Sequence, residues 1–279
     1  MRILVLGATG MLGSDLVPLL NSYDVIPAGS KDINIAEKDC IKKIADIKPD
    51  FIYLLAAYTN VEKCEDEVEK AFMVNAIGVR NVCIAAQKLN CPLLYISTDY
   101  VFDGKKDEPY YEFDKPNPLS VYGRSKYWGE IFVRDLLNKF FIVRTSWLYG
   151  KNGINFVYKM LEISKKNKVL KVVNDQTGSP TYTKDLAEAL TLFLNCEFYG
   201  IYHITNSGYC TWYEFAKKIF EIKGIDVEVI PVSSAEFPAK ARRPKNSRLS
   251  NLHFEKTFGR KLRHWHDALK DFLQHIGAF

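Results

Sequence analysis

Residues 1–13 of the chain read MRILVLGATGMLG, an apolar run that stops at Gly7 and is followed by Gly10 and Gly13. Such a short apolar run predicts a buried β-strand, and the leucines after the glycines predict a helix. Glycines between a strand and a helix let the backbone turn tightly and approach a pyrophosphate, which binds the free N–H groups of the helix N-terminus. The first residues therefore predict a dinucleotide-binding strand, turn and helix.

Short apolar runs rich in β-branched residues alternate with helical patterns through the first half of the chain. The predicted strands cover residues 3–6, 25–28, 51–56, 93–97 and 140–143, with helices predicted over 41–47 and 65–89. Continuously apolar strands are buried on both faces, and right-handed crossovers between them give a parallel sheet. The sequence therefore predicts an α/β fold with a Rossmann-like, doubly wound parallel sheet.

The pattern changes after Tyr149-Gly150-Lys151-Asn152-Gly153. The elements predicted beyond it are a helix over 156–165, a strand over 169–173, a helix that begins near Asp185 and a helix capped by Thr211. We therefore expect an NAD(P)-binding domain over residues 1–150 and a smaller C-terminal substrate-binding lobe over residues 151–279. Some segments of that lobe are expected to return to the main sheet, so the lobe is discontinuous in sequence.

Composition and charge exclude several classes of protein. The net charge of +5 is too small for 279 residues to predict nucleic-acid binding, and no apolar run approaches the roughly 20 residues of a membrane-spanning helix. The six cysteines form no Cys-x-x-Cys pair, which predicts a reducing compartment, the cytoplasm, and no structural metal. A basic segment over residues 240–248 can hold phosphates, although charge alone favours a solvated loop.

A tyrosine and a lysine one helical turn apart form the candidate catalytic pair. Tyr122 and Lys126 project from the same face of a predicted helix. A tyrosine with a pKa near 10 carries a proton that it can donate to a carbonyl oxygen, and a lysine cation stabilises the resulting tyrosinate. Such pairs are common on helix surfaces, but Thr98 places a hydroxyl at the end of the fourth predicted strand. The three residues together predict a site that reduces a carbonyl group.

The end of the second predicted strand bears on the choice of cofactor. An acidic residue there holds a ribose 2′-hydroxyl, whereas a basic residue accommodates a 2′-phosphate. Ser30 and Lys31 favour NADPH, but Asp32 follows directly. The sequence therefore leaves NADPH and NADH both open as cofactors.

The Gly-x-x-Gly-x-x-Gly spacing and the set of Thr98, Tyr122 and Lys126 resemble the short-chain dehydrogenase/reductase superfamily. Within it, the chain resembles the dTDP-4-dehydrorhamnose reductase family along essentially its whole length. The motifs that carry this resemblance are Ser97-Thr98-Asp99-Tyr100-Val101-Phe102, Val121-Tyr122-Gly123, Arg144-Thr145-Ser146-Trp147-Leu148-Tyr149, Asn174-Asp175-Gln176-Thr177-Gly178-Ser179-Pro180-Thr181 and Ala241-Arg242-Arg243-Pro244-Lys245-Asn246-Ser247-Arg248-Leu249.

The resemblance implies a role for each residue that matches a motif. Residues along the cofactor would be Gly10, Met11 and Leu12 at the pyrophosphate, Asp32 and Ile33 at the adenine, and Ala56, Ala57 and Tyr58 after the third strand. Tyr122 would donate the proton and Lys126 would hold the nicotinamide ribose. Substrate residues would be Thr98, Asp99 and Trp147 at the sugar, with Arg242 and Arg243 at the diphosphate.

The implied reaction is reduction of the 4-keto group of dTDP-4-dehydro-L-rhamnose to dTDP-L-rhamnose, with hydride from NADPH or NADH and a proton from Tyr122. It needs no metal ion. The expected partner is a nucleotide sugar rather than a nucleic acid or a membrane, and the protein is expected to be a monomer or a homodimer.

Some members of this family are described as dimers linked by magnesium through glutamates. Here Asp15 replaces one such position, residues 183–185 offer no clear match to a second, and the tail Gly277-Ala278-Phe279 has no carboxylate side chain. We therefore expect no interface metal, and the oligomeric state stays open.

Two alternative functions fit the same predicted fold. A nucleotide-sugar epimerase or dehydratase would retain its NAD through a redox cycle, but dehydratases place an acidic pair beside the threonine, and here only Asp99 follows Thr98. A non-catalytic NADP-binding subunit, similar to the regulatory subunit of methionine adenosyltransferase, would not need the Tyr122 and Lys126 pair.

Overall fold

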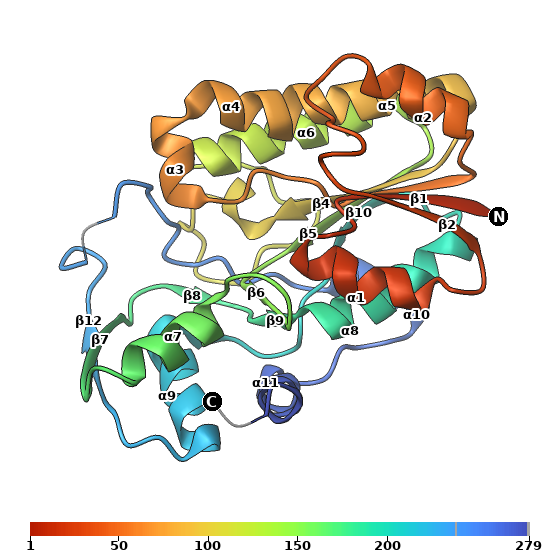
Figure 1. Ribbon diagram of the computed structural model, residues 1–279. Helices are drawn as coiled ribbons and strands as arrows, with labels where there is room; N and C mark the ends of the chain where they lie inside the picture. Colours follow the sequence, from red (N-terminus) through yellow and green to blue (C-terminus); the bar gives the residue numbers. More distant parts are fainter. Residues whose placement is uncertain (238, 278–279) are drawn as a thin grey trace.

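A parallel β-sheet forms the centre of the larger lobe of the protein, whose computed structural model describes residues 1–237 and 239–277 (Figure 1). The six strands lie in the order β10-β5-β4-β3-β1-β2, and every neighbouring pair is parallel. Their bounds are β1 Arg2–Leu6, β2 Asp24–Ala28, β3 Phe51–Leu54, β4 Leu93–Thr98, β5 Phe140–Thr145 and β10 Gly200–His203. The predicted doubly wound parallel sheet is confirmed.

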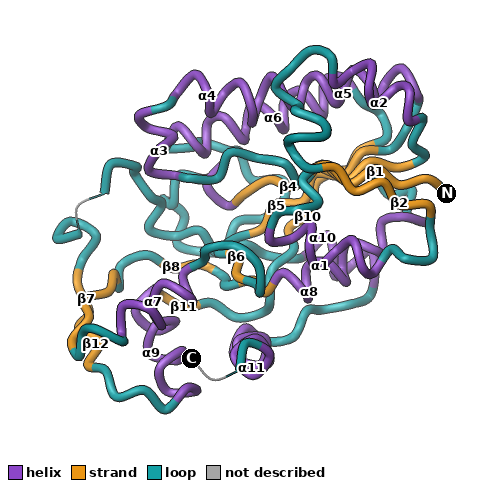
Figure 2. The backbone as a smooth tube through the Cα atoms, viewed as in Figure 1, coloured by secondary structure: helices purple, strands orange, loops and turns teal. Residues whose placement is uncertain are grey.

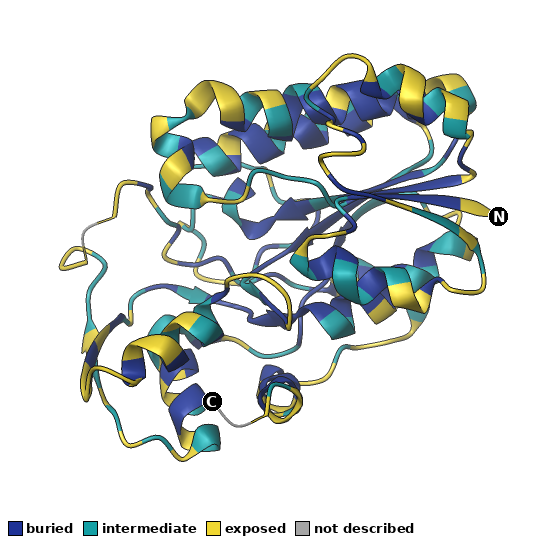
Figure 3. Ribbon diagram, viewed as in Figure 1, coloured by how far each residue is buried: buried dark blue, intermediate teal, exposed yellow. Residues whose placement is uncertain are grey.

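Helices cover both faces of this sheet, as Figure 1 shows. One face carries α2 Cys40–Ile47, α3 Val61–Asp66, α4 Val68–Phe72, α5 Val79–Leu89 and α6 Val121–Leu136, and the other carries α1 Met11–Leu19, α8 Thr183–Thr191 and α10 Leu252–Phe258. Alternate residues of β1 enter different cores: Leu4 and Leu6 pack with α2 and α5, whereas Ile3 and Val5 pack with α8 and α10. The inner strands β1, β3, β4 and β5 are therefore buried on both sides, whereas the edge strand β2 is only partly buried, as Figure 3 shows.

The helix predicted over residues 65–89 is wrong in detail, because the chain breaks it into several pieces. The backbone of Glu67 leaves the helical region, with φ −110° and ψ 54°, between α3 and α4. A π-helical turn, Met73–Gly78, then precedes α5. It carries the fully buried Asn75, whose amide accepts from Tyr58 N at 2.8 Å and donates to Ser125 Oγ at 3.1 Å. The widened turn thus aims a polar side chain toward α6.

The smaller lobe is built around a two-stranded parallel ribbon and three helices. Its elements are α7 Phe156–Ser164, β7 Val169–Val173, α9 Trp212–Lys223, β12 Glu228–Val232 and α11 Trp265–His275. Short strand pairs, β6 Leu148–Tyr149 with β9 Thr181–Tyr182 and β8 Thr177–Gly178 with β11 Cys210–Thr211, connect it to the sheet. α8, β10 and α10 belong to the larger lobe although they follow β7 in sequence (Figure 2).

The remaining elements are two 3₁₀ turns, Asp99–Val101 and Leu192–Asn195. No helix in the described part of the chain combines the length and the apolar character needed to cross a membrane.

A buried ion pair joins α6 to the sheet. Arg144, on β5, donates to both carboxylate oxygens of Glu130 at 2.9 and 2.7 Å, and each side chain is only 1% exposed. Ser97, on β4, donates to the same carboxylate at 2.5 Å. Arg144 also lies 3.4 Å from His203 Nε2, and burial together with the Arg144 charge holds the pKa of that imidazole well below its usual range. One carboxylate thereby connects the helix to two strands.

Replacing Glu130→Gln should lower the free energy of unfolding by about 3–5 kcal/mol, because the Arg144 guanidinium would stay buried without its counter-charge. Urea unfolding of the purified variant measures this loss. The control is Asp39→Asn, which breaks the exposed i,i+4 pair with Lys43 and should cost no more than about 1 kcal/mol. Equal losses in the two variants would contradict the role given to the buried pair.

Candidate active site

A cleft of about 570 Å³ lies at the carboxyl ends of β1, β3, β4 and β5, where ligands bind in open α/β sheets. The structure brings most of the predicted site residues to its wall. Those that line it are Gly7, Gly10, Met11, Leu12, Gly13, Ser30, Ile33, Ala56, Ala57, Thr98, Asp99, Tyr122, Lys126 and Trp147. Residues from three of the predicted motifs therefore border one hollow.

The glycine turn after β1 has the geometry that a pyrophosphate needs. Gly7 has φ +89°, and a Cβ on it would lie 2.6 Å from Ala56 N. A Cβ on Gly13 would lie 2.4 Å from the carbonyl oxygen of Gly7. α1 begins at Met11 without a side-chain cap, so its first N–H groups remain available to an anion. The turn therefore fits a dinucleotide and admits no side chain at two of its glycines.

The turn after β2 separates its two charged residues. Asp32 accepts a hydrogen bond from Gly29 N at 2.8 Å, so its carboxylate stabilises the turn itself. Ser30 lines the cleft. Lys31, the next residue, is exposed to solvent and does not line the cleft. A ribose bound beside Ser30 would thus contact the Ser30 hydroxyl rather than the Asp32 carboxylate.

The start of α6 is pressed against the end of β4. Ser120 caps the helix by accepting from Gly123 N at 3.1 Å. A Cβ on Gly123 would lie 2.2 Å from the carbonyl oxygen of Tyr100, so only glycine permits this approach. The contact brings Tyr122 beside Thr98, and both side chains line the cleft. The predicted hydroxyl and phenol therefore meet across the junction of strand and helix.

Burial sets the protonation of Tyr122 and Lys126. It raises the pKa of the Tyr122 phenol, an effect that the nearby Thr98 hydroxyl partly offsets, so the phenol keeps its proton at neutral pH. Desolvation lowers the pKa of Lys126 to about 7, against a smaller upward effect of Glu130. The ammonium group donates to the carbonyl oxygen of Ile96 at 2.7 Å and lies 4.1 Å from the centre of the Tyr95 ring.

Asp99 is a buried carboxylic acid in the same cleft as the Tyr122 phenol. Its side chain is 2% exposed and accepts from Thr98 Oγ1 at 3.0 Å. Burial raises the pKa of Asp99 to about 7, although hydrogen bonds from Ser247 and Thr98 act in the opposite sense. Tyr122, Thr98 and Asp99 thus lie together at the wall of the cleft, where a hydrogen bond joins Thr98 to Asp99.

The structure does not bring three other predicted residues to the cleft wall. The Tyr58 hydroxyl donates to Glu67 at 3.0 Å, and its ring lies beneath the Lys70 ammonium. Arg242 is exposed. Arg243 pairs with Glu62 on α3 and donates to the carbonyl oxygen of Ala241 at 3.2 Å. Its guanidinium group therefore bonds to the protein itself and not to a ligand.

Several residues to which the sequence assigned no role also line the cleft. They are Thr9, Asn34, Ile35, Leu55, Thr59, Val74, Ile96, Ser97, Thr145, Ser146, Leu148 and Ile154. A signal existed for Thr145 and Ser146, because they stand at the carboxyl end of a buried strand, as Thr98 does. The structure pairs Thr145 with Thr98 in register. None existed for Ile154, which reaches the cleft from the loop before α7.

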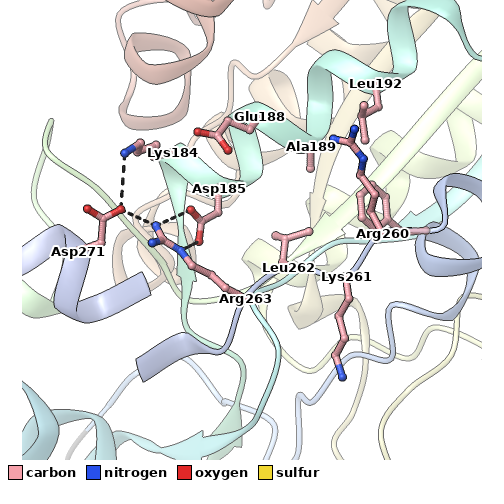
Figure 4. A pocket seen from close by; sticks show the side chains of 11 residues that line it. Lys184, Asp185, Glu188, Ala189, Leu192, Arg260, Lys261, Leu262, Arg263 and Asp271 are labelled. Atoms are coloured by element: carbon pink, nitrogen blue, oxygen red, sulfur yellow. Dashed lines mark hydrogen bonds and ion pairs between the residues drawn. The ribbon is translucent and has the colours of Figure 1, made fainter. Parts of the chain in front are cut away.

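A second hollow of about 360 Å³ lies away from the cleft, between α8 and the segment before α11 (Figure 4). Arg263 there bonds to both Asp185 and Asp271, and Lys184 also pairs with Asp271. The charged side chains of this hollow are therefore paired with one another.

Within residues 1–237 and 239–277, no group of three or more acidic, cysteine or histidine side chains is arranged to hold a metal ion. Asp15 accepts from the Thr183 hydroxyl, and Ala278 and Phe279 lie outside the described residues.

Comparisons with known proteins agree over nearly the whole chain. Residues 1–277 match the family described as RmlD substrate binding domain. The chain is 42% identical to the spore coat polysaccharide biosynthesis protein SpsK of Bacillus subtilis (strain 168), over 98% of this chain and 97% of that protein. It is 40% identical to a dTDP-4-dehydrorhamnose reductase of Sinorhizobium fredii, over 97% and 96%. A crystal structure of dTDP-4-dehydrorhamnose reductase from Bacillus anthracis in complex with NADP matches with a TM-score of 0.95 and 44% identity, over 98% of this chain and 99% of that one.

Burial of Lys126 predicts a pH-dependent contribution to stability. Because its pKa is about 7 in the folded protein and 10.5 as the ordinary value, unfolding takes up a proton between these pH values. The free energy of unfolding should therefore rise with pH in this window, by up to about 1.4 kcal/mol per pH unit.

Urea unfolding of the cofactor-free protein and of Lys126→Met at pH 7, 8 and 9 isolates this effect, since the other titrating groups are common to both. The wild type should gain stability relative to the variant as the pH rises. Lys70→Met, which removes an exposed lysine whose pKa is raised by Glu67, should show no such trend. If the difference in unfolding free energy between wild type and Lys126→Met did not change with pH, the lowered pKa of Lys126 would be refuted.

Proposed function

The chain belongs to the RmlD substrate-binding domain family, and we propose that it reduces the 4-keto group of dTDP-4-dehydro-L-rhamnose to give dTDP-L-rhamnose. The family resemblance of the sequence motifs is confirmed, and the enzyme is an NAD(P)H-dependent oxidoreductase. The observation that carries the proposal is the meeting of Tyr122, Thr98 and Lys126 in the same cleft as the glycine turn. A proton donor and a dinucleotide site are both required for this reaction, and here they share one wall.

The cofactor is NADPH or NADH, and the glycine turn fits its pyrophosphate because side chains are excluded at Gly7 and Gly13. The bound reduced nicotinamide supplies the hydride for C4 of the sugar. Lys126 would hold the nicotinamide ribose, and Ser30 and Ile33 would contact the adenosine end. The roles of these residues are part of the proposal.

Tyr122 protonates the alkoxide oxygen as the carbonyl is reduced. Its raised pKa keeps the proton on the phenol until that oxygen becomes strongly basic. Lys126 then stabilises the tyrosinate, because a neighbouring negative charge favours the ammonium form of a lysine whose pKa is near neutrality. Thr98 contacts the phenol and orients the keto oxygen by the same hydroxyl.

The substrate would extend from this point toward the smaller lobe. We propose residues 1–150 as the NAD(P)-binding domain and residues 151–279, without the segments that join the main sheet, as the substrate-binding lobe. Asp99 and Trp147 would contact the sugar, since both line the cleft. Diphosphate binding by Arg242 and Arg243 stays a prediction, and it requires Arg243 to exchange Glu62 for a phosphate.

Two further properties belong to the proposal. The six cysteines are all free thiols, which supports a reducing compartment such as the cytoplasm. The oligomeric state proposed is a monomer or a homodimer, as expected from the sequence.

Replacing Tyr122→Phe should lower kcat for reduction of dTDP-4-dehydro-L-rhamnose by about 10²–10⁴-fold, because the proton donor is removed while the ring is kept. The decrease in NADPH absorbance on addition of the keto sugar nucleotide measures the rate. Tyr127→Phe is the matched control, since Tyr127 lies on the same helix and packs outside the cleft. Full activity of Tyr122→Phe would exclude this phenol as the donor.

We also propose a preference for NADPH, because the carboxylate of Asp32 is engaged by Gly29 while Lys31 is free to meet a 2′-phosphate. Lys31→Ala should raise KM for NADPH about tenfold, the loss expected for one charged contact, and leave KM for NADH unchanged. Steady-state kinetics with each cofactor test this. The control is Lys38→Ala, an equal change of net charge at an exposed residue farther along the loop. Parallel changes with both cofactors would contradict the preference.

A further inference from the structure

Trp147 has an unusual backbone for so large a side chain. Its φ is +48°, in the left-handed region that favours glycine, directly before β6. Its carbonyl oxygen accepts a hydrogen bond from Thr181 N at 3.3 Å, which joins this turn to β9. Strained backbone of this kind persists only where surrounding contacts hold it, and it is concentrated at functional sites.

Trp212 provides one of these contacts. Its indole stacks on that of Trp147 with ring centres 3.4 Å apart and planes 6° apart. Behind it, Phe156 of α7 packs at 4.5 Å between ring centres. Trp212 is the first residue of α9, and a capping box formed by Thr211 and Glu214 fixes that end of the helix. The stacking partner is therefore held by a rigid helix start.

Gly178 provides the other contact. A Cβ on Gly178 would lie 2.5 Å from Cε2 and 2.7 Å from Nε1 of the Trp147 indole, so the backbone of β8 packs directly on the ring. Gly178 pairs with Cys210 of β11, just before the helix that carries Trp212. Gly178 and Trp212 thus reach the indole from one small strand pair and the helix that follows it, and neither lines the cleft.

The indole stands at the reacting end of the cleft. Thr145 is paired in register with Thr98, and Trp147 follows Thr145 by two residues. Both Trp147 and Tyr122 line the same hollow. Trp147 is half-buried and lines the cleft, so the part of its indole that Trp212 and Gly178 leave uncovered can contact the apolar C–H groups of a pyranose whose carbonyl meets Tyr122.

We propose that Trp212 and Gly178 are positioning residues that fix the Trp147 indole as the wall against which the sugar ring of the substrate packs. This inference rests on the proposed function, since it assigns the sugar of the nucleotide sugar to that wall. The smaller lobe then determines sugar specificity through residues that never touch the substrate. The strained turn at Trp147 is the element that they hold in place.

Circular dichroism tests the stack without turnover. Two indoles stacked face to face couple their transitions and give an exciton band, which Trp212→Leu should abolish. Trp128→Phe, which removes an exposed tryptophan of α6, should leave the band unchanged. An exciton band that persists unchanged in Trp212→Leu would overturn the stacked arrangement and the proposal with it.

Kinetics test the positioning role. Trp212→Leu and Gly178→Ala should each raise KM for dTDP-4-dehydro-L-rhamnose about tenfold, equivalent to about 1.4 kcal/mol, with kcat changed far less and KM for NADPH unchanged. Such a split indicates lost substrate binding rather than lost chemistry. Trp212→Phe, which retains an aromatic face, should restore most of the affinity, and inhibition by dTDP alone should be the same in all variants.

Trp265→Phe is the matched control for damage to the lobe. Trp265 is 3% exposed in the same core and packs on Phe215, but it does not line the cleft or touch Trp147. It should lower thermal stability and leave KM unchanged. A Trp212→Leu variant with wild-type KM, or a Trp265→Phe variant with an equally raised KM, would overturn the proposal. Failure of the wild type to reduce the keto sugar would count against the proposed function alone, and the dissociation constant of dTDP-L-rhamnose would then replace KM in the same comparison.

Discussion

The bond between Glu130 and Arg144 fixes the catalytic helix against the sheet, and the site depends on it. Glu130 lies one helical turn after Lys126 and two turns after Tyr122, and its carboxylate also accepts from Ser97, the neighbour of Thr98. Any slip of α6 along β4 would therefore separate the phenol from the threonine. Buried ion pairs are costly to desolvate and are poor evidence for stability in themselves. Here the pair specifies one register between helix and strand.

The same dry environment sets the chemistry. It keeps the proton on the Tyr122 phenol and weakens the hold of Lys126 on its own proton. Both shifts favour the uncharged ground state. In the proposed reaction the phenol gives up its proton to the substrate oxygen, and the new negative charge stabilises the ammonium form of the lysine. The proposed pair would thus be matched to a charge that exists only during the reaction, which is how electrostatic catalysis gains its effect.

Short sequence patterns predict much of the fold and the part of the site that would bind the cofactor. Apolar runs, the glycine spacing and the separation of Tyr122 from Lys126 are properties of neighbouring residues, and the sequence predicted each of them. Contacts between distant segments left no such signal. The π-helical turn that aims Asn75 at α6, the capture of Arg243 by Glu62 and the stack of Trp212 on Trp147 depend on packing between elements far apart in sequence. The sequence therefore predicted the residues that line the cleft better than the residues that hold them in place.

In the proposed reaction one hydride passes from the nicotinamide to C4 of the sugar while Tyr122 supplies the proton. NADPH that carries deuterium at both positions of nicotinamide C4 is allowed to react with dTDP-4-dehydro-L-rhamnose, and NMR and mass spectrometry then locate the label in the product. The expected product is dTDP-L-rhamnose with one deuterium, at C4 of the sugar, for each NADPH oxidised. A product without deuterium, or with deuterium at another carbon, would overturn direct hydride transfer to C4.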